Sequence, residues 1–138
     1  LEIALACDVR VVSQTAQVSD LHIRNLGSLG GAGVTVRLPR TVGQAWAKEI
    51  MFTGEPIDVQ RAVSIGLASY LFPSNTLLDE AISLARKFVP MNPTALSMAK
   101  SVINKAAGSE RKRRVLRDSY IASSALGSDN RKWKLKKP

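Results

Sequence analysis

Acidic residues near the start of the chain are the first candidates for chemistry. Only Glu2, Asp8 and Asp20 precede residue 49. A carboxylate that works as a general acid or base is usually held among apolar neighbours. Glu2, beside Leu1 and Ile3, is the only one of the three in such surroundings. Glu2 is therefore a candidate catalytic acid or base, although a first-turn acid that faces solvent is the commoner explanation for such a residue.

Histidine and cysteine each occur once. His22 follows Asp20 by two residues and is a second candidate for proton transfer, although a histidine is more often structural. Because Cys7 and His22 are the only soft ligands, no metal site is predicted. No serine lies in a G-x-S-x-G motif, so a hydrolase triad has no support.

A glycine-rich stretch, G-x-x-G-G-x-G, runs from Gly27 to Gly33. It matches neither the dinucleotide fingerprint nor a P-loop. Glycines allow a close approach of backbone amides, and a helix that starts after them would favour negative charge at its N-terminus. A loop that turns a tight corner is the alternative interpretation.

The net charge of +9 belongs mainly to the tail. Residues 1–104 hold 9 Lys and Arg against 8 Asp and Glu, whereas residues 105–138 hold 11 against 3. The clusters Arg111–Arg114 and Lys132–Lys137 could bind phosphates, and a solvated helix face is the commoner explanation.

The spacing of apolar residues indicates the elements that must position these groups. In the first half we expect a buried helical turn over 1–7, strands over Val9–Ser13 and Ala16–Ser19, and a helix from Gly43 to Thr53. In the second half we expect a helix from its N-cap Asp58 to Ile65, closed by Gly66, then a buried strand Leu67–Phe72. Helices over Leu77–Val89, Asn92–Ala107 and Glu110–Leu126 complete an α/β chain with a helical C-terminal portion.

Composition sets limits on the class of protein. The chain has 138 residues, 45% of them hydrophobic and 22% charged, which is typical of one globular domain. No segment has the roughly 18 apolar residues that a membrane span needs. We expect a soluble protein of the cytoplasm or mitochondrial matrix. The dense apolar start at Leu1 further suggests a chain that begins inside an element.

A series of motifs, in order along the chain, resembles the crotonase, or enoyl-CoA hydratase/isomerase, family. Leu1–Val11 is similar to the segment that follows its triple glycine, and Leu29–Arg40 to its glycine loop with the arginine-leucine-proline-arginine continuation. Phe52–Ala68 is similar to its threonine-glycine turn and glycine-leucine strand entry, and Asn92–Ala95 to the following helix.

The resemblance implies a crotonase-like strand–strand–helix spiral, of which this chain would be the C-terminal half. Residues 1–72 would belong to the core, residues 73–127 to a helical trimerisation-type region and residues 128–138 to a basic tail. It also implies an acyl-CoA thioester as substrate, no cofactor besides the coenzyme A of the substrate, and a homotrimer or hexamer. The family's oxyanion-hole amides would precede Leu1, so we expect no activity from this chain alone.

The resemblance gives Glu2 the position of the first of two glutamates that hold and deprotonate water in hydratases. Counting from Glu2 without a gap puts His22 at the second position, and counting back from Gly27 puts Ile23 there. Neither is a carboxylate, so Asp20 or His22 is a candidate substitute. The resemblance assigns the substrate pocket to Leu29, Gly30, Gly31, Ala32 and Gly33.

Two functions are therefore expected. The first is hydration, dehydration or double-bond isomerisation of an enoyl-CoA through an enolate, with Glu2 as acid or base. The alternative is a catalytically weakened family member that binds RNA or partner subunits, because the second glutamate is missing and the tail is basic.

Overall fold

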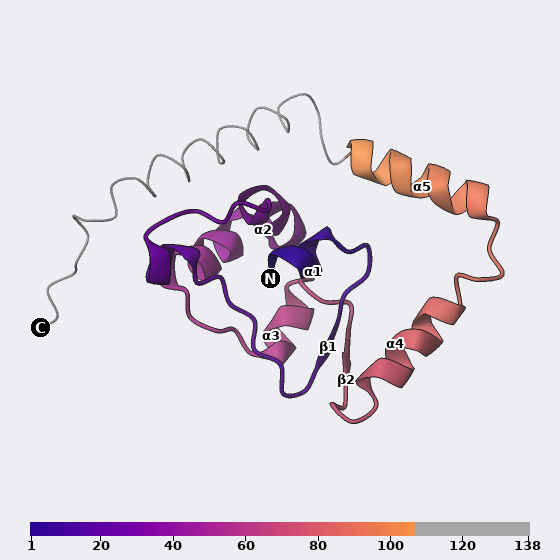
Figure 1. Ribbon diagram of the computed structural model, residues 1–138, viewed down its shortest axis with the longest axis horizontal. Helices are drawn as coiled ribbons and strands as arrows, with labels where there is room; N and C mark the ends of the chain where they lie inside the picture. The colour runs from indigo at the N-terminus through magenta and orange to yellow at the C-terminus, as the bar shows by residue number, and fades with distance from the viewer. Residues whose placement is uncertain (107–138) are drawn as a thin grey trace, which may run out of the picture.

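The computed structural model describes residues 1–106. The elements follow in the order α1 (Glu2–Ala6), β1 (Val11–Ser13), the π-helix η1 (His22–Leu26), α2 (Val34–Thr53), α3 (Val59–Ser64), β2 (Tyr70–Phe72), α4 (Leu77–Arg86) and α5 (Pro93–Ala106) (Figure 1). The described part is thus an α/β chain that ends in two helices. The predicted helix Glu110–Leu126 and the basic tail 128–138 lie outside the described residues.

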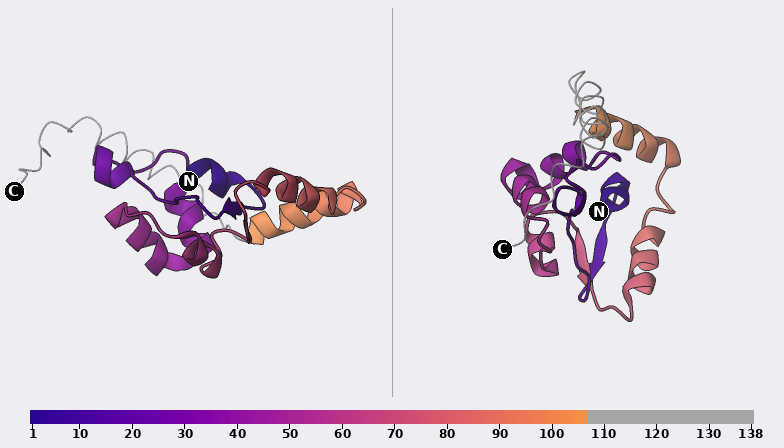
Figure 2. Two further views of the ribbon diagram at one scale, coloured as in Figure 1. Left: turned by 90° about the horizontal axis from the view of Figure 1, so that it is seen from below. Right: turned by 60° about the vertical axis from the view of Figure 1, so that its left-hand side comes forward.

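Strands β1 and β2 pair in parallel, with Val11 opposite Tyr70 and Ser13 opposite Phe72. They lie side by side in Figures 1 and 2. Because neighbouring parallel strands need a long crossover, η1, α2 and α3 all occur in the connection between them. This connection carries the chain past the candidate site and back to the sheet.

All three strand predictions are too long. The expected strand Val9–Ser13 is shortened to β1, Val11–Ser13. The expected strand Ala16–Ser19 is reduced to one antiparallel bridge between Val18 and Ile57. The expected buried strand Leu67–Phe72 is shortened to β2, and Tyr70 is 46% exposed. Leu67 and Ala68 are buried, but they belong to the turn after α3 rather than to the strand. A short apolar run does not distinguish these two cases.

Helix α2 begins at Val34, well before the predicted start at Gly43. Gly43, at φ 80° and ψ 162°, joins two helical segments at a kink. Val34, Leu38 and Val42 repeat every four residues and are all buried, which is the helical spacing that the preceding glycines obscured. The correction matters because it puts a helix N-terminus directly after the glycine loop.

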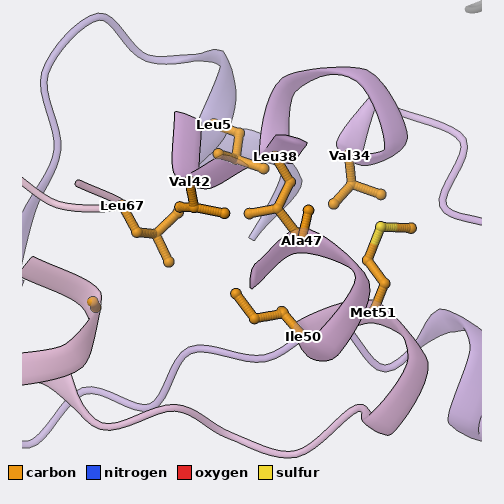
Figure 3. Close-up of a cluster of buried hydrophobic side chains, with 9 residues drawn as sticks. Leu5, Val34, Leu38, Val42, Ala47, Ile50, Met51 and Leu67 are labelled. Carbon is orange, nitrogen blue, oxygen red and sulfur yellow. The ribbon is translucent and has the colours of Figure 1, made fainter. Parts of the chain in front are cut away.

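The hydrophobic core joins α1 to α2 and α3. Figure 3 shows the cluster, whose buried members are Leu5, Val34, Leu38, Val42, Ala47, Ile50, Met51, Ala62 and Leu67. A five-residue helix such as α1 is not stable by itself, so its packing through Leu5 is what holds it in place.

The predictions for α3 are confirmed. The Asp58 side chain accepts a hydrogen bond from the backbone N–H of Arg61 at 2.7 Å, and Gly66 follows the helix with a φ of 76°. Helix α4 ends at Arg86 rather than at Val89, and α5 is capped by Asn92, whose Oδ1 accepts the N–H of Ala95.

The two C-terminal helices differ from α1, α2 and α3 because none of their described side chains is buried. Both extend along one side of the body in Figure 1, and Lys100 of α5 contacts Asp8 at 2.6 Å. No helix among residues 1–106 is long and apolar enough to cross a membrane.

Candidate active site

Glu2, Asp20 and His22, the three residues singled out from the sequence, lie together in the structure. Glu2 is the first residue of α1, His22 is the first residue of η1, and Asp20 lies just before η1. The loop Gly30–Gly33 closes the group and leads into α2. Leu5 anchors α1 against α2, and this packing sets the position of Glu2.

Backbone N–H groups hold the side chain of Glu2 in place and set the direction in which it points. Its Oε1 accepts the N–H of Ala32 at 2.9 Å and the N–H of Val34 at 3.4 Å, and its side chain is 17% exposed. Val34 is the first residue of α2 and Ala32 lies two residues before it, so Oε1 lies at the helix N-terminus, where the helix dipole also favours negative charge. The other oxygen, Oε2, lies 3.9 Å from His22 Nε2.

Asp20 holds His22 from the opposite side. Its Oδ1 accepts the backbone N–H of His22 at 3.0 Å and lies 2.7 Å from His22 Nδ1. The Asp20 side chain is 1% exposed, whereas that of His22 is 33% exposed. Asp20 Oδ2 is buried without a hydrogen-bond partner among the described residues. The buried carboxylate of Asp20 therefore lies behind the partly exposed imidazole of His22, which faces Glu2.

Gly30 lies directly against this group. A Cβ placed there would be 2.6 Å from Glu2 Oε1, 2.7 Å from Val34 Cγ1 and 3.1 Å from His22 Cε1. Only a residue without a side chain fits at this position. The glycine loop therefore packs against the side chains of Glu2 and His22, rather than only turning a corner.

The other four residues of the predicted substrate pocket differ from one another. Leu29 packs against the hydrophobic core, and Ala32 contributes its N–H to Glu2. Gly33, with a φ of 96°, is the N-cap residue of α2. Gly31 is exposed, and a Cβ there would meet nothing within 4 Å. The donor Val34 N–H was not predicted, because the start of α2 was missed.

The structure distinguishes the two candidates for the second glutamate position. Both lie in η1, His22–Leu26, and their side chains point in different directions. Consistent with this, His22 faces Glu2 and Ile23 packs against the core.

An open groove of about 830 Å³ lies at the other end of α1, between the body and α5. Its lining includes Cys7, Arg37, Phe88 and Lys100, but not Glu2, His22 or Gly30. Arg37 and Lys100 are already engaged, with the carbonyl of Ala32 and with the carboxylate of Asp8. Within residues 1–106, no cluster of three or more His, Cys, Asp or Glu side chains could hold a metal ion.

Comparison with known proteins gives this geometry a context. A sequence profile described as Enoyl-CoA hydratase/isomerase matches residues 1–135. The chain belongs to the enoyl-CoA hydratase/isomerase family. It is 41% identical over 108 residues to the mitochondrial methylglutaconyl-CoA hydratase of Rattus norvegicus, a match that covers 75% of this chain and 34% of that protein. It is 40% identical over 105 residues to 2,3-dehydroadipyl-CoA hydratase of Escherichia coli K12, covering 76% of this chain and 41% of that protein.

Membership of the family extends to the fold. The crystal structure of an enoyl-CoA hydratase from Mycobacterium tuberculosis H37Rv matches with a TM-score of 0.83 and 26% identity, over 94% of this chain and 56% of that one. The predicted crotonase-like α/β fold is thereby confirmed. The chain spans 34% to 41% of the length of the two curated relatives above.

Proposed function

We propose that this chain carries the catalytic acid of an enzyme that hydrates, dehydrates or isomerises an enoyl-CoA thioester through an enolate. The observation that carries the proposal is the set of contacts made by the Glu2 carboxylate. One carboxylate oxygen is held by two backbone amides, and the other faces His22. The membership of the enoyl-CoA hydratase/isomerase family supplies the substrate class.

In the hydration direction, a water molecule beside Glu2 Oε2 loses one proton to that oxygen while its own oxygen bonds to C3 of the enoyl group. The electron pair of the double bond moves toward the thioester carbonyl and gives the enolate. Glu2 then returns the proton to C2, so that water is added and Glu2 is regenerated. Isomerisation uses the same carboxylate to move a proton from one carbon to another.

The reaction as written needs no separate cofactor, since coenzyme A is part of the substrate. The compartment that we propose is the cytoplasm or the mitochondrial matrix. Relatives of both bacterial and mitochondrial origin support this range. The acyl-CoA hydratase names of these relatives also favour the enzyme over the RNA-binding alternative, whose basic clusters lie outside the described residues.

The association surface that we propose consists of α4 and α5, which would join copies into a homotrimer or hexamer. Leu78 of α4 is 72% exposed, and Met98 and Val102 of α5 are each 64% exposed. Such apolar side chains gathered on two helices are typical of an interface.

The proposed function is tested with the full-length gene product and a short enoyl-CoA, by following the loss of the conjugated thioester. Glu2→Gln keeps the shape of the side chain but cannot accept a proton, so kcat/KM should fall about 10²- to 10⁴-fold. The matched control is Glu49→Gln, an exposed glutamate on α2, which should keep the parent rate. Equal rates for Glu2→Gln and the parent would remove Glu2 from the mechanism.

A further inference from the structure

We infer that His22 replaces the second carboxylate of the hydratase site as the residue that orients the attacking water, and that Asp20 is the positioning residue that fixes the ring. The inference rests on the proposed function and deepens it. Its basis is the continuous line of contacts from Asp20 Oδ1 to His22 Nδ1, at 2.7 Å, and from His22 Nε2 to Glu2 Oε2, at 3.9 Å.

The contacts of Asp20 determine which ring nitrogen carries the proton. Oδ1 already accepts the backbone N–H of His22, so it is an acceptor toward the ring as well. Nδ1 must then carry the proton and donate it. In the neutral ring this leaves Nε2 with a lone pair, directed to the side where Glu2 lies. Asp20 thus sets the tautomer from a position that is almost fully buried.

The distance between His22 and Glu2 suits a water molecule. At 3.9 Å the two atoms are too far apart for a direct hydrogen bond. A single water oxygen can lie about 2.8 Å from both, which is an ordinary hydrogen-bond length. That water would donate one hydrogen to Glu2 Oε2 and the other to His22 Nε2, and its lone pairs would remain free to attack carbon.

In this arrangement Glu2 is the only residue that gains and loses a proton. Glu2 takes one proton of the water as the C3–O bond forms, and returns it to C2. The second proton stays on the oxygen, which becomes the hydroxyl group of the product and remains hydrogen-bonded to Nε2. His22 contacts the reacting water without gaining or losing a proton, and Asp20 acts only through His22.

Single substitutions test this assignment. The assay is the hydration of a short enoyl-CoA by the full-length gene product. His22→Ala should lower kcat/KM about 100-fold, within the range for lost catalytic groups. Asp20→Asn should lower it about 10- to 100-fold, as the loss of a ring-orienting partner does. The exposed Asp79→Asn on α4 is the control and should change nothing.

The sign of the Asp20 effect separates positioning from a structural role. His22→Glu installs a carboxylate at the family's second position, but next to the buried carboxylate of Asp20, and like charges there repel. Asp20→Asn should therefore raise the activity of His22→Glu, although it lowers that of the parent. A loss in both backgrounds, or full activity of His22→Ala, would overturn the inference.

Two further readouts distinguish a failure of this inference from a failure of the proposed function. If the parent hydrates the substrate and needs Glu2 but not His22, this inference fails and the proposed function stands. If Glu2→Gln also keeps the parent rate, the proposed function fails. Nitrogen-15 NMR of the full-length gene product, with the His22 signals assigned by their loss in His22→Ala, adds a readout besides activity: a proton on Nδ1 is expected, and one on Nε2 in the neutral ring would contradict the inference.

Discussion

At the scale of single residues, the candidate site is built around Glu2. The sequence makes Glu2 a candidate because it is an acid among apolar neighbours, at a position that resembles the family's first glutamate. Asp20 and His22 could be named only as alternatives, because the count to the second position gave two answers. Their contacts in the structure distinguish the two positions, because His22 faces Glu2 and Ile23 packs against the core.

Gly30 gives the prediction that belongs to this scale. In Gly30→Ala, the new methyl group would overlap Glu2 Oε1 and Val34 Cγ1, so one of them must move. We expect a loss of about 1–3 kcal/mol in the free energy of unfolding. We also expect about a 100-fold fall in kcat/KM, since a displacement of about 1 Å in a catalytic group costs that much. Thermal unfolding and the hydration assay measure the two effects, and an unchanged rate would show that Gly30 does not position Glu2.

At the scale of elements, the sequence predicts a helix accurately where capping residues mark its two ends. Helix α3 was predicted closely because Asp58 caps it and Gly66 terminates it. The start of α2 was missed because Gly33 offers no side-chain cap, and the kink at Gly43 was mistaken for the helix start. Since Val34 is the first residue of α2, missing this start also hides its N–H as a donor to Glu2.

Gly43 and Gly31 form a matched pair that tests the kink. Both are exposed, and a Cβ at either position would meet nothing within 4 Å. They differ in the backbone, because Gly43 has φ 80° and ψ 162°, a region that other residues rarely adopt. We expect Gly43→Ala to lower the free energy of unfolding by about 1–3 kcal/mol. Gly31→Ala should leave it unchanged or raise it by up to about 1 kcal/mol. Urea denaturation measures both, and equal midpoints would show that the kink carries no strain.

At the scale of the whole molecule, the described residues form a body with a hydrophobic core, followed by two helices, α4 and α5, that contribute no residue to that core. All buried core residues lie between Leu5 and Ala68. In α5, Leu96, Ala99 and Ile103 line the groove, while Met98 and Val102 lie on the face turned away from it, given the helical period. Composition and periodicity predicted these helices but could not show that their apolar faces lack a partner within residues 1–106.

The prediction at this scale concerns association. Met98→Glu combined with Val102→Glu puts two charges on the outward face of α5, and burying unpaired charge at an interface is costly. We expect the full-length gene product to shift to a smaller species in sedimentation velocity at the same protein concentration. Gln44→Glu, an exposed position on α2, is the control. An unchanged assembly would show that this face of α5 is not the interface.

The central claim is that Glu2 moves a proton between water and C2 of an acyl-CoA. Incorporation of solvent deuterium at C2 tests it most directly, with the full-length gene product incubated with a short enoyl-CoA in D₂O. We predict that the parent and Glu49→Gln place deuterium at C2 at equal rates, and that Glu2→Gln is slower by at least about 100-fold. Incorporation by Glu2→Gln at the parent rate would contradict the account.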